Sequence, residues 1–261
     1  MRSISVVLLA ALAVPGAALV AQTPQANHMH ALQYVPPYVH AAVADPARGG
    51  DASNDARRKV ADVMVFSNVK PGEKVLELIP GSGYFTRVFS GIVGATGHVY
   101  ALWPDEYVKV DGDELAPFEK LAADPHYSNV SVLKQPAAQL SVPQPVDIVF
   151  TSQNYHDYPD KFMGKVDPVA FDKQVFAALK PGGLFIVIDH VAPAGSGMAD
   201  TDTLHRIDPA IVKKQVESAG FVFAGESNVL RNPSDPHTNK VFDKSIRGHT
   251  DQFIYRFRKP G

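Results

Sequence analysis

The stretch Val75-Leu76-Glu77-Leu78-Ile79-Pro80-Gly81-Ser82-Gly83-Tyr84-Phe85 contains an apolar run, a glycine turn and the start of an amphipathic segment. The apolar run predicts a buried strand over residues 74–79. Apolar residues then recur at the spacing of one helix face, at Phe85, Val88, Phe89 and Ile92. Glycine at positions 81 and 83 leaves the backbone open to a ligand, because no Cβ blocks the approach. The stretch therefore predicts a strand–turn–helix unit with a ligand-binding turn.

Helical and strand patterns alternate on both sides of this unit. The predicted helices cover residues 55–66, 85–93, 114–123 and 169–179 and a segment that begins at 209, and the other predicted strands cover 98–103, 130–134, 146–151, 184–188, 221–223 and 253–257. Asp167-Pro168 and Asp208-Pro209 each supply an N-cap and a proline at the first helical position. This alternation predicts one Rossmann-like α/β domain with a mostly parallel seven-stranded sheet, helices on both faces and an antiparallel last strand.

Composition limits the classes of partner. The 261 residues are 45% hydrophobic, carry a formal charge of −2 and include no cysteine. Without a basic surplus or a Lys/Arg run, the chain is not expected to bind nucleic acid. The absence of cysteine excludes disulfides and attachment of a lipid to a thiol. Nothing in the sequence indicates an oligomeric state.

The first residues resemble a targeting segment. Arg2 precedes an apolar run over residues 6–20, and small residues lead up to Ala21. This order predicts a signal peptide over residues 1–21, and hence an exported protein that is periplasmic or secreted. The apolar run is shorter than the roughly 20 residues that a spanning helix needs, so no membrane span is expected after cleavage. Residues 22–53 are expected to form a loosely ordered arm, and residues 54–261 the folded domain.

Three local features carry a resemblance to a known family. They are Val75-Leu76-Glu77 with Gly81-Ser82-Gly83, the turn Leu179-Lys180-Pro181-Gly182-Gly183, and the ending in two strands. With them the chain resembles the class I S-adenosylmethionine-dependent methyltransferases, in particular a group of exported bacterial proteins usually labelled predicted methyltransferases. The resemblance covers roughly residues 54–259. It implies that S-adenosylmethionine is the cofactor.

The resemblance also assigns cofactor positions. Glu77 is expected near the methionine amine, and Gly81, Ser82 and Gly83 near the sugar and methionine portion. Ser152, at the end of the fourth strand, is expected on the same side.

The chain departs from the family pattern at three of these positions. Ile79 replaces a glycine, Trp103 replaces the carboxylate that usually accepts hydrogen bonds from the ribose, and Pro136 replaces an aspartate near the adenine. Stacking of Trp103 on the base, and a ribose contact from Asp105 or Glu106, would compensate for the lost contacts.

Candidate catalytic residues follow the fourth and fifth strands. These are His156, His190 and His205 with Tyr155 and Arg206, beside Asp157 and Asp189. Ligands bind beyond the carboxyl ends of the strands in open α/β sheets, so the three histidines are expected on one face. Histidine suits general acid–base catalysis because its pKa lies near neutrality. Three histidines with carboxylates would also suit a metal ion, but their spacing matches no metal motif, so no metal site is predicted. The alternative is that each histidine has a structural role.

The segment between the last two strands, residues 228–252, is several times longer than a hairpin needs. It is interpreted as a lid that presents Arg231, Lys240 or Arg247 to an anionic group. The alternative is a solvated surface loop.

Three functions fit the sequence. The first is an exported S-adenosylmethionine-dependent methyltransferase that acts on a small, anionic molecule. The second is a lyase or hydrolase on the same fold that uses the histidines and aspartates. The third is a non-catalytic binding protein in which Trp103 and Tyr155 line a pocket.

Overall fold

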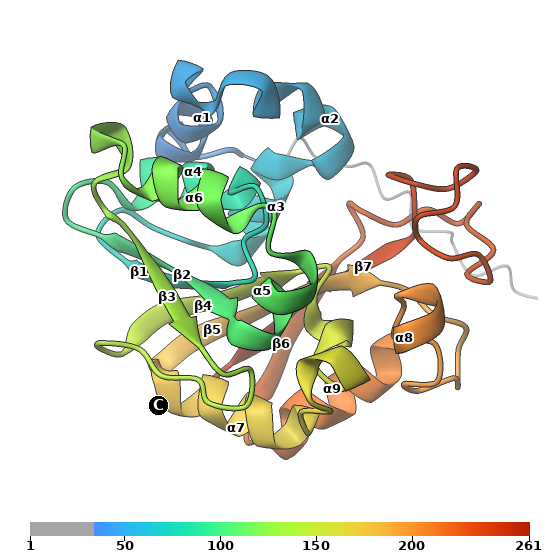
Figure 1. Ribbon diagram of the computed structural model, residues 1–261. Coiled ribbons are helices and arrows are strands. Elements are labelled where there is room, and N and C mark those ends of the chain that lie inside the picture. The colour runs from blue at the N-terminus through green and yellow to red at the C-terminus, as the bar shows by residue number, and fades with distance from the viewer. Residues whose placement is uncertain (1–33) are drawn as a thin grey trace, which may run out of the picture. The chain divides into compact units, whose positions relative to one another are not determined.

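The computed structural model describes residues 34–261 (Figure 1). The predicted signal peptide and residues 22–33 of the predicted arm lie outside this range. Within it, no helix has both the length and the apolar character needed to cross a membrane.

One seven-stranded sheet with the order β3-β2-β1-β4-β5-β7-β6 organises the described chain. The strands are β1 Lys74–Leu78, β2 His98–Pro104, β3 Val130–Gln135, β4 Val146–Ser152, β5 Leu179–His190, β6 Val222–Ser227 and β7 Gln252–Arg258. The first five strands pair in parallel, whereas β7 is antiparallel to both β5 and β6. The predicted α/β class and the antiparallel last strand are confirmed.

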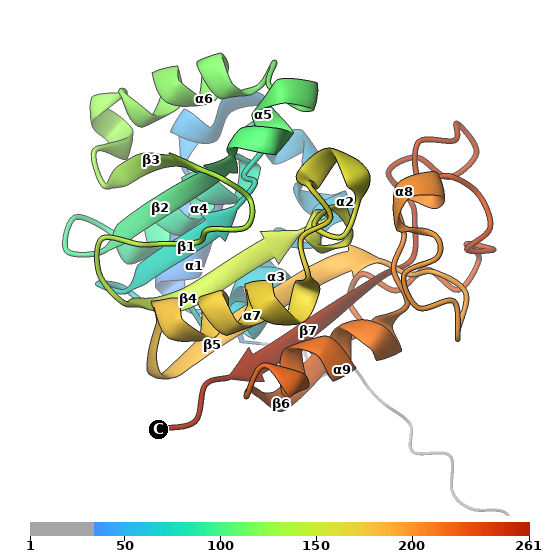
Figure 2. The ribbon, with the colours of Figure 1, turned by 60° about the horizontal axis from the view of Figure 1, so that its bottom comes forward.

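Helices cover both faces of the sheet, as Figures 1 and 2 show. The α-helices are α1 Pro37–Val43, α2 Asp55–Arg58, α3 Val60–Ser67, α4 Tyr84–Val93, α5 Asp105–Asp111, α6 Leu115–Ala122, α7 Pro168–Ala178, α8 Thr201–Leu204 and α9 Pro209–Ser218. Short 3-10 helices are η1 Pro46–Asn54, η2 Pro125–Tyr127, η3 Tyr155–Asp157 and η4 Lys161–Met163. The first face is covered by α1, α3, α4 and α6, and the second by α7 and α9.

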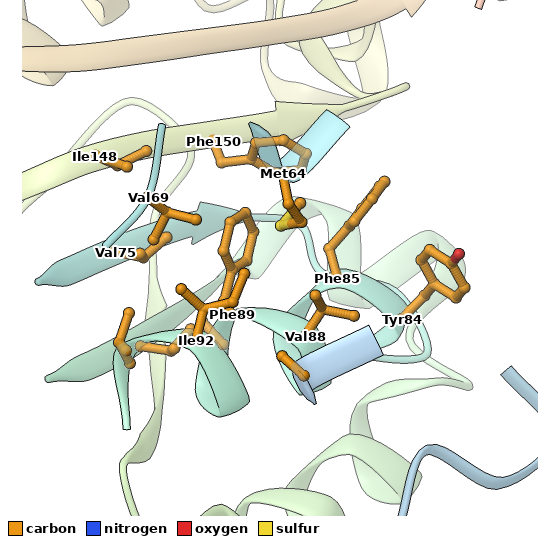
Figure 3. Close-up of a cluster of buried hydrophobic side chains, with 14 of the residues drawn as sticks. Met64, Val69, Val75, Tyr84, Phe85, Val88, Phe89, Ile92, Ile148 and Phe150 are labelled. Atoms are coloured by element: carbon orange, nitrogen blue, oxygen red, sulfur yellow. The ribbon is translucent and has the colours of Figure 1, made fainter. Parts of the chain in front are cut away.

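The alternation of side chains along β1 divides the core into two clusters. Val75 packs into the first cluster, whereas Leu76 and Leu78 pack into the second. In the first cluster, the rings of Phe85 and Phe89 on α4 each lie 4.9 Å from the ring of Phe150 on β4 (Figure 3). The predicted amphipathic helix thus lies where its apolar spacing requires. Glu77 shares the first face with Val75, so its carboxylate points toward α4.

The prediction of a loosely ordered arm is wrong for residues 34–53. Val39 and Ala42 of α1 are buried against the first core cluster. Arg48 is buried and donates to Asp55 at 2.6 and 2.9 Å. An isolated helix of this length is not stable in water, so docking against α4 is what orders it.

A prediction tests the docking of α1. A Cβ at Gly91 on α4 would lie 2.9 Å from the Cβ of Ala42. Gly91→Val is therefore expected to lower the free energy of unfolding by about 1–3 kcal/mol, because the close contact cannot accept the added atoms. Gly50→Val is the matched control, since no atom lies within 4 Å of a Cβ there. Chemical denaturation of both variants measures the effect, and equal stability would contradict this packing.

The predicted helix over residues 55–66 is interrupted. Lys59 has a φ of 49°, which separates α2 from α3. The break directs the end of α2, with Arg58, toward the carboxyl ends of the strands, where Arg58 lines a cavity.

Candidate functional site

A cavity of about 670 Å³ lies beyond the carboxyl ends of the parallel strands. Its walls include the last residues of three strands, Leu78 of β1, Ser152 of β4 and His190 of β5. This is where the topology of an open α/β sheet places a ligand. The volume falls in the range of small-molecule sites.

The turn after β1 forms the floor of the cavity. Ile79, Gly81 and Ser82 line it, as the sequence predicted for the last two. Ile79 has a φ of 49°, so its backbone adopts the left-handed region that favours glycine, and a β-branched residue is rarely found there. The turn therefore keeps the backbone shape of a glycine turn despite the substitution. Gly83 has a different role: a Cβ there would come within 3.1 Å of Phe118 and Leu121 on α6, so this glycine permits close packing.

Glu77 is the buried acid of the cavity. Its side chain accepts a hydrogen bond of 2.5 Å from the Thr86 hydroxyl, and the residue is only 2% exposed. Burial raises the pKa of Glu77 to about 8, although the hydrogen bond from Thr86 and the charge of Arg58 oppose the shift. The site thus holds a carboxyl group that a bound cation would ionise.

Arg58 supplies the positive charge in the same cavity. Its guanidinium lies 4.3 Å from the ring of Tyr84 and 4.5 Å from the ring of Phe85. Burial lowers the pKa of Arg58, and no described residue forms an ion pair with it. A cation held on two aromatic faces, with its hydrogen-bond donors unused among residues 34–261, can bind a carboxylate.

Two acidic residues line the opposite wall. Asp111 ends α5, and Glu114 precedes α6 with a carboxylate oxygen 3.0 Å from the Cβ position of Gly81. Burial and the charge of Asp111 raise the pKa of Glu114. Asp105 and Glu106, the predicted replacements for the ribose carboxylate, do not line the cavity; Glu106 accepts from the Ala137 amide at 2.7 Å instead. Asp111 and Glu114 line the cavity, whereas Asp105 does not.

The expected stacking of Trp103 on a ligand is wrong. Trp103 is fully buried in the first core cluster, with its ring 5.6 Å from that of Phe118. Because β2 places Trp103 on the face covered by α6, the indole supports the fold rather than the cavity.

The three predicted histidines come together at the far end of the cavity. His156, His190 and His205 all line it. Asp189, fully buried on β5, accepts from the backbone N–H of His156 at 2.8 Å and from that of His190 at 2.7 Å. It also lies 2.8 Å from Nδ1 of His156, and this contact assigns the proton to Nδ1.

The second ring nitrogen of His156 faces two further groups. Nε2 lies 3.2 Å from Oδ1 of Asp157 and 3.4 Å from Nδ1 of His205. Burial opposes the charged form of His156, but Asp189 and Asp157 raise its pKa to about 9. Burial, with the charge of His156, lowers the pKa of His205 to about 4. Burial also lowers the pKa of His190 to about 3, so the cluster contains one charged and two neutral imidazoles near neutral pH.

Two other candidates for catalysis lie away from the cavity. The hydroxyl of Tyr155 donates to Asp172 at 2.8 Å within the second core cluster. Arg206 is fully buried, donates to Asp235 at 2.9 and 3.1 Å, and also donates to the backbone carbonyls of Val191 and Asn239. Their predicted catalytic roles are wrong, because neither side chain reaches the cavity and both are committed to internal contacts.

The segment after β6 lies on the ligand side, as predicted. In Figures 1 and 2 residues 228–251 lie beside α8. Val241 and Phe242 from this segment line the cavity. A neighbouring cavity of about 550 Å³ is lined by Arg231, which is paired with Asp251 at 2.8 Å. Arg58, Phe85, Ser152 and Gln153 line both cavities.

Comparisons with known proteins agree with this architecture. No protein-family model matches the sequence. The chain is 29% identical over 195 residues to the "Ubiquinone/menaquinone biosynthesis C-methyltransferase UbiE" of Ectopseudomonas mendocina (strain ymp), a match that covers 72% of this chain and 63% of that protein. The chain thus spans less than two thirds of the length of this relative.

Solved structures show the same fold. A SAM-dependent methyltransferase from Aquifex aeolicus matches 82% of this chain and 98% of its own, with a TM-score of 0.55 and 19% identity. The glycopeptide N-methyltransferase MtfA, complexed with S-adenosylmethionine, matches 77% of this chain and 87% of its own, with a TM-score of 0.52 and 16% identity. The sequence similarity and the shared fold both agree with the resemblance of this chain to the class I S-adenosylmethionine-dependent methyltransferases.

Proposed function

We propose that the protein is an S-adenosylmethionine-dependent methyltransferase that acts on a small molecule. The observation that carries the proposal is that a buried acid, Glu77, and a cation, Arg58, line the same cavity beside the glycine turn. The methionine end of S-adenosylmethionine carries one ammonium and one carboxylate. Glu77 would bind the ammonium, and Arg58 would bind the carboxylate.

The other wall fits the nucleoside end. The carboxylates of Asp111 and Glu114 can accept hydrogen bonds from ribose hydroxyls, although neither follows β2 directly. The ring of Tyr107 also lines the cavity and offers a face for the base. These residues would supply the cofactor contacts that the family obtains from a carboxylate at the position where this chain has Trp103.

The histidine cluster would prepare the methyl acceptor. When bound, the cofactor supplies an electrophilic methyl group on its sulfonium. His205 is neutral near neutral pH, so Nδ1 can accept a proton from the acceptor. His156 is charged in the absence of other ligands and would stabilise the negative charge that remains. The name of the UbiE relative gives a C-methyltransferase activity, and a carbon acceptor would also require loss of a proton.

Calorimetric titration with S-adenosylmethionine tests the proposal. We expect micromolar affinity for the natural protein, and Arg58→Met to raise Kd about tenfold or more, because a charge-assisted hydrogen bond contributes about 1.5–3 kcal/mol. Arg57→Met is the matched control, since Arg57 is exposed and lines only the neighbouring cavity. No binding of the natural protein up to millimolar cofactor would overturn the proposal. Equal affinities of the two variants would show that Arg58 does not bind the cofactor.

We also propose that the protein works after export and on an anionic acceptor. The composition of residues 1–21 supports export, and the charge of His156 supports an anionic acceptor. Fractionation of the producing cell and sequencing of the mature N-terminus, expected at Gln22, test the location.

A further inference from the structure

Three donor atoms at the end of the cavity lie at distances suited to one metal ion. Nε2 of His156 is 3.2 Å from Oδ1 of Asp157 and 3.4 Å from Nδ1 of His205, and the latter two atoms are 3.9 Å apart. Bonds of about 2.0–2.2 Å from one ion to nitrogen and oxygen would separate neighbouring ligand atoms by roughly 3.0–3.6 Å. The shorter two distances fall in this range, and the third exceeds it by a few tenths of an ångström.

The surroundings of His156 are those of a metal-binding imidazole. Asp189 accepts from Nδ1 at 2.8 Å and from the backbone N–H of His156 at 2.8 Å. These bonds fix the ring and direct Nε2 toward Asp157 and His205. A carboxylate that holds the remote nitrogen of a histidine is the usual partner of a metal ligand.

The cluster has an excess of carboxylates. Asp157 and Asp189 contact His156, and Asp160 is buried nearby with one oxygen, Oδ2, that has no hydrogen-bond partner among the described residues. The other oxygen of Asp160 accepts from Thr201 at 2.6 Å. A divalent cation would balance the negative charge of these buried carboxylates.

The donor set is open on one side. His156, Asp157 and His205 come from two segments, the turn after β4 and the end of α8, and all three line the cavity. Three protein ligands with free positions toward a cavity are typical of catalytic rather than structural metal sites.

We propose that His156, Asp157 and His205 bind a divalent transition-metal ion whose open coordination positions face the cavity. Two imidazoles and one carboxylate favour zinc, manganese, iron, cobalt or nickel over magnesium or calcium, which prefer oxygen ligands. Binding transfers the Nε2 proton of His156 to solvent and replaces it with the ion. With Nδ1 of His205 and Nε2 of His156 bound to it, the ion would take over the roles proposed for these two imidazoles, because it would hold an oxygen of the acceptor and stabilise its negative charge. This last step rests on the proposed methyltransferase function.

Metal titration of the full mature protein tests the site. The protein is stripped with a chelator, and Zn²⁺, Mn²⁺ and Co²⁺ are added in separate calorimetric titrations, with the Co²⁺ absorption spectrum as a direct report of ligand geometry. We expect one ion per chain with Kd at or below the micromolar range, and a Co²⁺ spectrum with nitrogen and oxygen ligation. No ion bound below millimolar concentration would overturn the proposal.

Variants locate the ion. His205→Ala and Asp157→Asn are each expected to weaken binding by about 100-fold or more, and Asp189→Asn by about 10- to 100-fold. His249→Ala, an exposed histidine beside the neighbouring cavity, is the control and should bind as the natural protein does. Circular dichroism of every variant confirms folding, and Asp157→Asn serves as the test if His205→Ala does not fold. Equal affinity in all variants would overturn the assignment of these ligands.

S-adenosylmethionine titrated into the stripped protein separates the two proposals. Cofactor binding without any metal binding would overturn the metal site and leave the proposed methyltransferase function standing.

Discussion

Glu77→Gln is expected to weaken S-adenosylmethionine binding by about 10- to 100-fold. The same substitution is expected to stabilise the ligand-free protein at alkaline pH. The carboxylate is the only group of β1 that can neutralise a bound ammonium in the cavity. Glutamine keeps the shape and can still accept from Thr86, so the loss of affinity would reflect the missing charge.

The stabilising effect follows from the raised pKa of Glu77. Burial raises it to about 8 in the folded protein, from an ordinary value of 4.5. The folded state therefore holds this proton more tightly than the unfolded state does. Stability is lost as pH rises from about 4.5 through 8, where the buried group must ionise. Glutamine does not ionise, so the variant is expected to lie within about 1 kcal/mol of the natural protein at pH 5 and to exceed it by about 4–5 kcal/mol above pH 8.

Denaturation at pH 5, 7 and 8.5, with calorimetric titration of the cofactor, measures both effects. Glu119→Gln is the control, because Glu119 is an exposed residue of α6 paired with Lys134 at the surface. Unchanged cofactor affinity in Glu77→Gln would refute the assigned role of Glu77. A stability difference that does not grow with pH would show that its carboxyl group is not the source.

Asp235→Ala is expected to destabilise the protein by about 3–5 kcal/mol, because it leaves the guanidinium of Arg206 buried without its counter-ion. Both side chains of this pair are fully buried. Asp235 also accepts from the backbone N–H groups of His237 and Asp251. Its loss would therefore loosen residues 228–251, including the Phe242 wall of the cavity.

Thermal unfolding measures this effect. For a chain of this size, the expected loss corresponds to a fall in Tm of roughly 6–20 °C. Lys134→Ala breaks an exposed ion pair and is the control, with an expected change of at most about 1 kcal/mol. If Asp235→Ala unfolds at the temperature of the control, the Arg206–Asp235 pair is not what anchors the segment.

Much of the fold follows from local sequence signals, as β1, α4 and the N-cap of α7 show. The apolar run of β1 and the helix spacing after Gly83 need no distant partner to be recognised. The Asp167 side chain accepts from the Ala170 amide at 2.9 Å, as the Asp-Pro pair predicted. By contrast, α1 depends on contact with α4, which lies far along the chain, and its short sequence carries no signal for that contact.

The residues that line the cavity were harder to predict from the sequence than the fold, because they depend on the direction in which each side chain points. The histidines and the Gly81 turn could be predicted because strand ends fix their place. Trp103 lies near the end of β2 and Arg206 lies between α8 and α9, yet both point into packed regions, which depend on α6 and on Asp235 respectively. Arg58 could not be found in this way, because it lies in a predicted continuous helix and the break at Lys59 has no local sequence signal such as glycine or proline.

The wall shared by the two cavities bears on inhibitor design. Arg58, Phe85, Ser152 and Gln153 contribute to both spaces, so a single molecule can occupy them together. An inhibitor that joins an amino-acid headgroup in the larger cavity to an anionic arm reaching Arg231 would engage two sites through one short linker. The second contact would then form at high effective concentration, and affinity would rise without a stronger contact at either end. Selectivity would come from the arm, because Arg231 lies in the long segment between β6 and β7 and not in the turn after β1.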